Sequence, residues 1–285
     1  MITVTGATGQ LGRLTIAALL QRGVPAAEIV AGVRNVERGA ELAALGVQVR
    51  HADYDRPETL AEAFAGSDRL LLISGSEVGK RVAQHANAVA AAKAAGVRLL
   101  AYTSILNADT SGVGLAEEHR ATEALVRDSG LPFVLLRNGW YLENYTANLA
   151  PALQHGAILG SANDGRVAAA TRADYAAAAA AVLTGDGHDN KVYELGGDQP
   201  FTMAELAAEV TRQSSVTVVY RDLPPAEYAA ALAAAGLPEP VAAMLADSDQ
   251  GVARGELNTD RRDLRTLIGR PTTTLGEAIG AALPA

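Results

Sequence analysis

A glycine-rich turn near the start of the chain is the feature that most constrains the fold. Residues 2–5 are apolar or β-branched and predict a buried strand. Three glycines follow at once, at Gly6, Gly9 and Gly12, and residues 11–22 then carry apolar side chains at helical intervals. A strand, a glycine turn and a helix in this order make the first half of a dinucleotide-binding βαβ unit.

The glycines allow the backbone to come close to a ligand. A side chain would hold the backbone away from a pyrophosphate, whereas the first turn of the helix offers free N–H groups to such an anion. The spacing G-x-x-G-x-x-G is a variant of the more usual G-x-G-x-x-G, and a plain turn between strand and helix is the alternative. We predict that the whole run binds the cofactor: Gly6, Ala7, Thr8, Gly9, Gln10, Leu11 and Gly12.

Composition narrows the classes to which the chain can belong. Of 285 residues, 49% are hydrophobic and 20% are charged, as in an ordinary globular protein. The net charge of −8 argues against nucleic acid as a partner, and the absence of cysteine excludes disulfides and thiolate sites. The histidines are too widely spaced to predict a metal site. With neither a signal peptide nor a membrane-spanning stretch evident, we expect a cytoplasmic protein without membrane insertion.

Strand and helix patterns alternate through the first half of the chain. The predicted strands cover residues 29–33, 47–50, 70–73, 97–102 and 133–136, and the predicted helices cover 37–45, 57–65, 78–95 and 115–129. A glycine follows each of these helices, at Gly46, Gly66, Gly96 and Gly130, where a positive φ would end the helix. This alternation predicts a parallel sheet covered by helices on both faces.

After Trp140 the pattern changes. A polar stretch at 144–148 leads to loops around glycines 156, 160 and 165. The next predicted elements are a helix at 174–183, a strand at 192–195, a capped helix at 203–213 and a strand at 216–220. The rest of the chain is predicted to be helical, with breaks at 236–238 and 269–271. We therefore predict an α/β protein with a Rossmann-type doubly wound parallel sheet in residues 1–145, joined by the late strand near 191–196. Residues 146–285 are expected to form a smaller α/β substrate-binding lobe, with the ligand between the two.

The end of the second predicted strand distinguishes NADP from NAD. An acidic residue there would bond the adenosine ribose and repel a 2′-phosphate. The strand instead ends at Val33, and Arg34 follows it, with a guanidinium suited to a phosphate dianion. A surface arginine in a loop is the alternative. We predict NADPH as the cofactor.

Two further segments follow predicted strands. Asp53 comes after the third strand, where it could accept a hydrogen bond from the adenine amino group or serve as an ordinary turn residue. Ser74, Gly75 and Ser76 follow the fourth strand. Because ligands of doubly wound sheets lie beyond the carboxyl ends of the strands, these residues should border the cofactor.

Together these segments resemble the atypical short-chain dehydrogenase/reductases of the NmrA-like branch and, within it, the type 2 NADPH-dependent quinone oxidoreductases. The resemblance is carried by residues 6–12, 33–35, 71–74, 101–104, 136–145, 170–175 and 271–275. It implies a reductase that transfers a hydride from NADPH to a quinone. It also implies that two segments line the nicotinamide half of the cofactor site: Asn138, Gly139, Trp140, Tyr141, Leu142 and Glu143, and Ala170, Thr171, Arg172, Ala173 and Asp174.

The chain departs from the wider family at its catalytic dyad. That family commonly uses Tyr-x-x-x-Lys on the helix after the fifth strand, and alignment on Glu123 places Leu115 and His119 at those two positions. The missing dyad argues against an alcohol dehydrogenase of the usual mechanism. A quinone tolerates the loss because a hydroquinone anion is far less basic than an alkoxide, so catalysis could rest on holding the nicotinamide against a flat acceptor in a dry site.

Three side chains are candidates for contact with that acceptor. Tyr141 could stack on or hydrogen-bond the quinone ring beside Asn138, or merely pack a seam between the two parts of the chain. His119 could donate a proton or bond the nicotinamide ribose, or be a solvated helix residue. The alternative function is a non-catalytic NADP-binding redox sensor. A third hypothesis, an isomerase or epimerase, agrees least with the sequence because the catalytic tyrosine is missing. A homodimer is compatible with the sequence.

Overall fold

The computed structural model describes residues 1–147 and 149–283. Asn148, the last residue of the predicted polar stretch, lies outside the described residues, as do the last two residues of the predicted C-terminal lobe.

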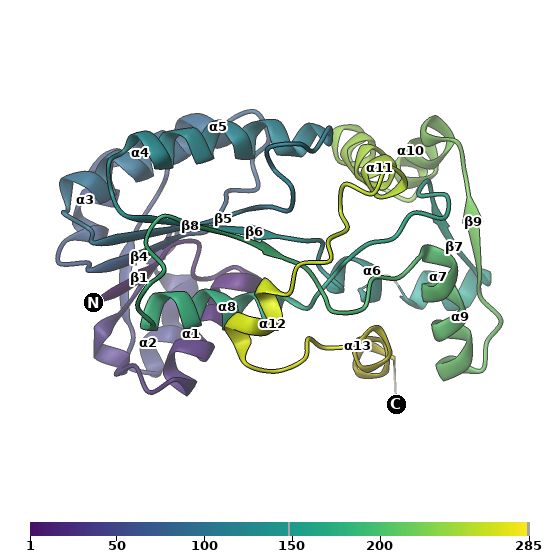
Figure 1. Cartoon of the computed structure of the whole chain (residues 1–285), viewed down its shortest axis with the longest axis horizontal. Coiled ribbons are helices and arrows are strands. Elements are labelled where there is room, and N and C mark those ends of the chain that lie inside the picture. The colour runs from purple at the N-terminus through teal and green to yellow at the C-terminus, as the bar shows by residue number, and fades with distance from the viewer. Residues whose placement is uncertain (148, 284–285) are drawn as a thin grey trace.

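A seven-stranded parallel sheet forms the centre of the molecule (Figure 1), in the order β3-β2-β1-β4-β5-β6-β8. The strands are β1 (Ile2–Val4), β2 (Ile29–Val33), β3 (Gln48–His51), β4 (Arg69–Leu72), β5 (Leu99–Ile105), β6 (Phe133–Asn138) and β8 (Lys191–Leu195). Strands β2 and β3 lie on one side of β1, and β4, β5, β6 and β8 lie on the other. The strand order therefore reverses at β1, so the switch point of the sheet lies at the end of β1, directly before the glycine turn.

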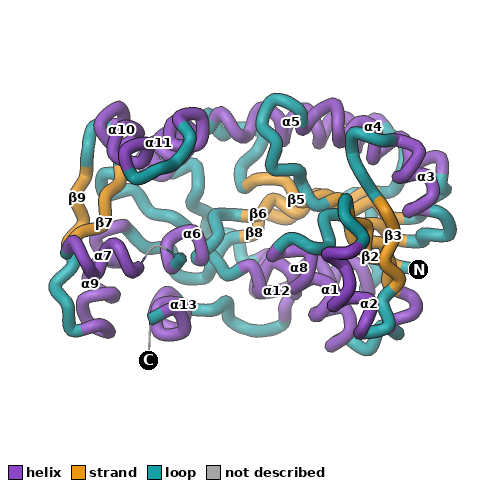
Figure 2. The backbone as a smooth tube through the Cα atoms, turned by 180° about the vertical axis from the view of Figure 1, so that it is seen from behind, coloured by secondary structure: helices purple, strands orange, loops and turns teal. Residues whose placement is uncertain are grey.

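Helices cover both faces of this sheet (Figures 1 and 2). One face carries α3 (Pro57–Phe64), α4 (Arg81–Ala94) and α5 (Gly114–Asp128), and the other carries α1 (Gln10–Gln21), α2 (Ala40–Ala44), α8 (Arg172–Thr184) and α12 (Asp263–Ile268). Short 3₁₀ turns, η1 (Ala26–Glu28) and η2 (Glu37–Gly39), flank β2. The sheet is apolar on both sides: Ile16 and Leu19 of α1 are fully buried on one face, as are Leu60 and Phe64 of α3 on the other. The predicted doubly wound α/β fold is confirmed.

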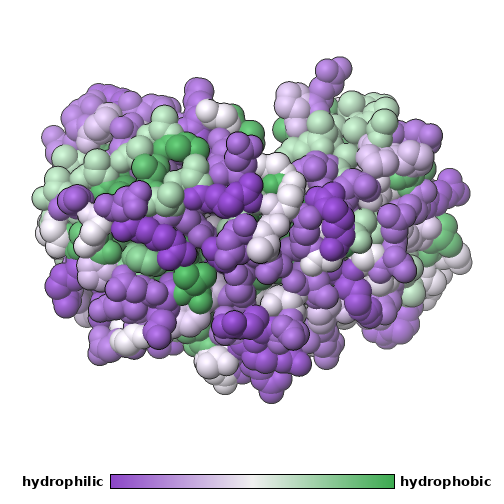
Figure 3. All heavy atoms as spheres, turned by 45° about the horizontal axis from the view of Figure 1, so that its top comes forward, coloured by the Kyte–Doolittle hydropathy of each residue, from purple (hydrophilic) through white to green (hydrophobic). Residues whose placement is uncertain are grey.

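The C-terminal lobe surrounds a second, two-stranded parallel sheet of β7 (Ala157–Gly160) and β9 (Val219–Asp222). Its helices are α6 (Glu143–Thr146), α7 (Leu149–His155), α9 (Met203–Ser214), α10 (Pro225–Ala234), α11 (Glu239–Ala253) and α13 (Leu275–Ala282). The space-filling view shows a notch at the upper edge between the sheet-bearing part on the left and this lobe on the right (Figure 3).

The sheet and its helical layers continue beyond residue 145. The late strand predicted at 192–195 is β8, which pairs with β6, and α8 packs against α1 while α12 packs against α8. The division of the chain into 1–145 and 146–285 therefore stays a prediction. The four glycines expected to end helices all have positive φ, between 68° and 86°.

Three expectations for the second half were wrong. The residues around Gly156 and Gly160, which were expected to be loops, include strand β7. The strand predicted at 216–220 begins only at Val219, because the Thr211 hydroxyl bonds both the N–H and the carbonyl of Val218 and keeps this residue out of the ladder. The predicted helical remainder is interrupted at 254–262, a non-helical segment that runs back to the main sheet.

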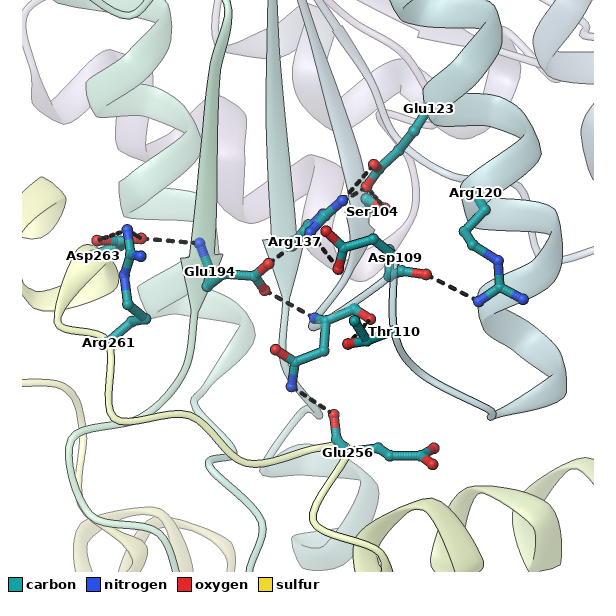
Figure 4. A network of polar contacts seen from close by, with 12 residues as sticks. Ser104, Asp109, Thr110, Arg120, Glu123, Arg137, Glu194, Glu256, Arg261 and Asp263 are labelled. Carbon is teal, nitrogen blue, oxygen red and sulfur yellow. Dashed lines mark hydrogen bonds and ion pairs between the residues drawn. The ribbon is translucent and has the colours of Figure 1, made fainter.

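A buried ion-pair network fastens that returning segment to the sheet (Figure 4). The Arg137 guanidinium, at the end of β6, bonds both carboxylate oxygens of Glu123 at 2.8 and 2.9 Å and one oxygen of Glu194 at 2.8 Å. The other oxygen of Glu194 accepts the backbone N–H of Asn107, and the Asn107 amide donates to the carbonyl of Glu256 at 2.9 Å. Helix α5, strands β6 and β8, and the returning segment are thus joined through one buried cation.

No helix in the described part of the chain is long and apolar enough to cross a bilayer. Residues 1–147 and 149–283 also contain no cluster of three or more His, Cys, Asp or Glu side chains arranged to hold a metal ion.

The C-terminal lobe contains a carboxyl group that makes its stability depend on pH. Burial raises the pKa of Asp249 to about 6, and its Oδ2 accepts a hydrogen bond from the N–H of Ser161 at 2.8 Å. Because this pKa is above the unfolded value, the folded state binds the proton more tightly. The resulting stabilisation is complete below about pH 4 and is lost as the pH rises through about 6.

We expect Asp249→Asn to remove this loss, because the amide cannot ionise and its oxygen can still accept from Ser161. Urea unfolding should find the variant more stable than the parent protein by about 2 to 3 kcal/mol near pH 8 and equally stable near pH 4. Asp164→Asn, at an exposed position of the same lobe, is the control and should show no such difference. A gap between Asp249→Asn and parent that stays constant over this range would contradict the assignment.

Candidate functional site

The glycine turn brings the backbone and the start of α1 to the switch point of the sheet. Gly6 has a φ of +57°, and Gly9 occupies the N-cap of α1. No side chain in the described part of the chain caps this helix, so its first N–H groups remain available to an anion. A Cβ on Gly12 would lie 2.4 Å from the Gly6 carbonyl oxygen and 2.7 Å from the Ala7 Cα, whereas one on Gly9 would meet only the Gly6 oxygen, at 3.2 Å. Gly12 therefore serves the packing of turn against helix, and Gly9 leaves space in front of it.

A cavity of about 600 Å³ opens over this turn, along the carboxyl ends of β1, β2, β3 and β4. Twelve of the residues predicted to bind the cofactor line it: Gly6, Thr8, Gly9, Gln10, Leu11, Gly12, Arg34, Asp53, Ser74, Gly75, Ser76 and Arg172. The size of the cavity and the polar backbone groups around it are suited to a dinucleotide. The glycine turn forms only part of its lining, and the rest comes from the segments that follow the other strands.

The sequence analysis missed several lining residues. These are Ala52, Tyr54, Glu77, Gln84 and Asn35. Arg38 and Ile73, close in the chain to the predicted residues, complete the lining. The Tyr54 hydroxyl donates to the carbonyl of Ile73 at 2.8 Å and so fixes the loop after β3 against the end of β4. Most of these residues stand next to predicted strand ends, which is the signal that could have found them. Gln84 lies on α4, and no pattern in the sequence points to it.

The wall after β4 is held by a histidine. The Gly75 N–H donates to His85 Nε2 at 3.0 Å, and the Gly75 carbonyl accepts from Arg81 Nε at 2.9 Å. The Thr122 hydroxyl gives its proton to the Glu118 carbonyl, so His85 Nδ1 must donate to the Thr122 oxygen, which is 3.0 Å away. Burial, aided by the Arg81 charge, lowers the pKa of His85 to about 3. The ring is therefore neutral near pH 7 and fixed as one tautomer.

Backbone hydrogen bonds join the two segments that were predicted to line the nicotinamide half of the cofactor site, residues 138–143 and 170–174. We call this pair of segments the Tyr141 wall. The Leu142 N–H donates to the Ala170 carbonyl at 2.9 Å, and the Ala170 N–H donates to the Trp140 carbonyl at 3.1 Å. A Cβ on Gly139 would lie 2.9 Å from the Ala168 carbonyl oxygen, so the close contact requires glycine. The two segments singled out by the resemblance, 138–143 and 170–174, are thus brought side by side.

Arg172 connects this wall to the cavity. Its guanidinium lies 4.3 Å from the centre of the Tyr141 ring and donates to the Asn144 side chain at 2.9 Å. Its backbone N–H donates to the Glu143 carboxylate at 2.9 Å. Within the segments 138–143 and 170–174, Arg172 alone also lines the cavity, so the cavity and the Tyr141 wall meet at its side chain.

Tyr141 and Asn138 carry polar groups suited to a ligand. Burial raises the pKa of Tyr141, and the Asn138 side chain and the Arg172 charge only partly offset this effect. The Tyr141 hydroxyl is therefore protonated near neutral pH. Asn138 is buried, and its Oδ1 has no hydrogen-bond partner among the described residues. An unpaired buried oxygen of this kind is costly unless a ligand bonds it.

Other predicted residues lie outside the cavity. His119 is 5% exposed, its Nδ1 is 2.7 Å from the Tyr102 hydroxyl, and burial lowers the pKa of the ring to about 3. It is not a solvated helix residue, and its predicted catalytic role has no support from this geometry. Asp174 is fully buried and pairs with Arg270 and with the N–H of Thr273. The remaining predicted residues that do not line the cavity are Ala7, Asn138, Gly139, Trp140, Tyr141, Leu142, Glu143, Ala170, Thr171 and Ala173.

The chain matches known proteins over its whole length. A family model described as NAD(P)H-binding matches residues 6–186. Quinone oxidoreductase 2 of Escherichia coli strain K12 is 55% identical over 98% of this chain and 97% of its own length. The crystal structure of the NADPH-dependent quinone oxidoreductase of Escherichia coli complexed with NADPH has a TM-score of 0.96, with 54% identity and 99% of both chains covered. The triphenylmethane reductase of Citrobacter sp. complexed with NADP(H) has a TM-score of 0.95, with 43% identity, and covers 99% of this chain and 100% of its own.

The two glycines predict different outcomes when each is changed to alanine. In Gly9→Ala the new Cβ stands in the space before the helix N-terminus, so we expect dinucleotide affinity to fall by at least about tenfold, or about 1.4 kcal/mol, with little change in melting temperature. In Gly12→Ala the clash is internal, and we expect a loss of about 1 to 3 kcal/mol of stability. Calorimetric titration and thermal unfolding of the same preparations measure both effects. Normal dinucleotide affinity in Gly9→Ala would mean that the turn serves folding alone.

Proposed function

The chain belongs to the NAD(P)H-binding family, and on that premise we propose that it is an NADPH-dependent reductase that transfers a hydride to a quinone. The observation that carries the proposal is the junction at Arg172, where the cavity over the glycine turn meets a wall with a protonated phenol and a buried amide oxygen that has no hydrogen-bond partner among the described residues. The full-length similarity to a quinone oxidoreductase supports the same conclusion. It also favours the enzyme over the non-catalytic redox sensor.

The residues present suit NADPH. The N–H groups at the start of α1 would hold the pyrophosphate, and Arg34, which follows β2, would bind the 2′-phosphate. The loop at 74–76 would border the cofactor, and residues 138–143 with 170–174 would lie beside the nicotinamide. When bound, NADPH supplies the hydride.

The chain's own groups bind and orient the acceptor and meet the charge that develops on it. A quinone that accepts a hydride becomes a hydroquinone anion, and water completes the reduction by supplying one proton. The Tyr141 hydroxyl, kept protonated by its raised pKa, can donate a hydrogen bond to the acceptor oxygen. The guanidinium of Arg172 over the Tyr141 ring adds a positive charge next to that hydroxyl.

No residue at the usual dyad positions can act as a strong acid. Leu115 packs against the apolar cluster of the C-terminal lobe, and His119 is a buried neutral ring whose pKa near 3 makes the imidazolium form rare at pH 7. An acceptor whose reduced form is weakly basic fits this arrangement, whereas a simple ketone does not. The cytoplasmic location and the homodimer stay predictions.

Hydride transfer to a quinone is the direct test. NADPH-loaded protein is mixed with a small benzoquinone in a stopped-flow instrument, and the loss of NADPH absorbance is followed. Tyr141→Phe keeps the ring under Arg172 and removes only the donor, so we expect kcat to fall by about tenfold, or about 1.4 kcal/mol, with NADPH affinity little changed. Tyr193→Phe removes a hydroxyl that bonds His188 elsewhere in the fold and is the matched control.

The contrary outcomes are distinct. If the parent protein binds NADPH but does not reduce benzoquinone faster than free NADPH does, the proposed function is wrong. If Tyr141→Phe and Tyr141→Ala lower only the melting temperature and leave the kinetics of the folded fraction unaltered, Tyr141 packs a seam and is not part of the reaction site.

Arg34 should distinguish the two nicotinamide cofactors. We expect Arg34→Ala to weaken NADPH binding by about 1.5 to 3 kcal/mol, the range for hydrogen bonds to charged groups, and to leave NADH binding nearly unchanged. Arg56→Ala, which removes another exposed arginine from an ion pair with Glu58, is the control. Fluorescence titration of both cofactors gives the comparison, and equal losses for NADPH and NADH would show that Arg34 does not contact the 2′-phosphate.

A further inference from the structure

An ion pair crosses the rim of the cavity above the glycine turn. Arg34 follows β2 and Glu77 follows β4, the two strands that flank β1, and Arg34 Nη1 lies 2.8 Å from Glu77 Oε1. Both side chains line the cavity. The guanidinium assigned above to the 2′-phosphate therefore already holds an anion that belongs to the chain itself.

The carboxylate has a second cation within reach. Lys80 Nζ lies 3.3 Å from Glu77 Oε2, the oxygen that Arg34 does not bond. The Lys80 hydrogen bond and charge, with a smaller contribution from Arg34, lower the pKa of Glu77, so the group is ionised near neutral pH. Glu77 can thus release Arg34 and keep one charge partner.

The exchange requires little energy and little movement. The side chains of Arg34 and Glu77 are 67% and 35% exposed, and ion pairs in such settings contribute little to stability. The loop around Glu77 is anchored on both sides, by the bonds of Gly75 to His85 and Arg81 and by the bond from the Gly79 N–H to Glu118 at 2.8 Å. Movement can be confined to the residues between these two anchors.

We propose that Glu77 is a specificity-determining residue that competes with the cofactor's 2′-phosphate for Arg34. A phosphate dianion on Arg34 would face the Glu77 carboxylate at close range, so binding of NADPH must exchange one anion for the other, and Glu77 then pairs with Lys80 alone. NADH has no phosphate at this position and leaves the ion pair in place. The inference rests on the proposed function only in its assignment of Arg34 to the 2′-phosphate.

Cofactor binding to four proteins tests the competition: the parent, Glu77→Gln, Lys80→Gln and the double variant. We expect Glu77→Gln to bind NADPH about 2- to 5-fold more tightly, the range that corresponds to an exposed ion pair, and to bind NADH unchanged. Lys80→Gln should weaken NADPH binding, because the displaced carboxylate loses its second partner, and this effect should vanish in the double variant. Glu37→Gln is the control for a general change of charge, since Glu37 is close to Arg34 in the chain, exposed, and makes no ion pair with a described residue.

Four other outcomes would overturn the inference, each in a different way. Weaker NADPH binding in Glu77→Gln would mean that Glu77 orients Arg34 for the phosphate. Equal tightening of NADPH and NADH would mean that the loop, not the phosphate, is affected, and the same gain in Glu37→Gln would reduce the effect to net charge. Failure of Arg34→Ala to change the preference for NADPH would remove both the assignment of Arg34 and the competition. A protein that shows the predicted binding pattern but reduces no quinone would contradict the proposed function alone.

Discussion

One buried guanidinium holds together the parts of the chain that meet at the candidate site. Arg137 loses its water on folding, a large cost that its bidentate bond to Glu123 and its bond to Glu194 offset. The next residue along β6 is Asn138, so the network fixes the strand end from which the Tyr141 wall departs. Ser104, on β5, donates its hydroxyl to Glu123 at 2.6 Å and is part of the same network.

The site itself is made by two segments that are far apart in the sequence. The segment after β6 and the segment before α8 join through backbone bonds between Trp140, Leu142 and Ala170, and the missing side chain of Gly139 allows their close approach. Arg172 then extends from this seam into the cavity. The glycine turn at the start of the chain and the Tyr141 wall near its middle thereby become one continuous surface.

The parts of this arrangement that the sequence predicts are those decided locally. Buried parallel strands are apolar over their whole length, a turn that admits a phosphate needs Gly9, and a helix that ends on a positive φ is followed by a residue such as Gly96, so each leaves a pattern in consecutive residues. The features that the sequence does not predict have tertiary causes. The burial of His119 against Tyr102 and the capture of Val218 by Thr211 depend on residues brought together by folding. The ion pair of Glu77 with Arg34 spans two separate strands, and no spacing in the sequence encodes it.

The neutral ring of His85 has a consequence for acid conditions. Its edge contacts with Tyr54 and Tyr102, with ring centres 5.8 and 5.4 Å apart, keep water from the imidazole, and a proton on Nε2 would set one donor against the N–H of Gly75. With a pKa near 3, this ring stays neutral at moderately acidic pH and continues to hold the loop at Gly75. Asp249, in the other part of the molecule, gains its proton near pH 6. A moderate fall in pH therefore stabilises the region around β7, where Asp249 bonds Ser161, while the loop that His85 holds beside the cavity keeps its shape. Acidity thus affects these two regions of the molecule differently.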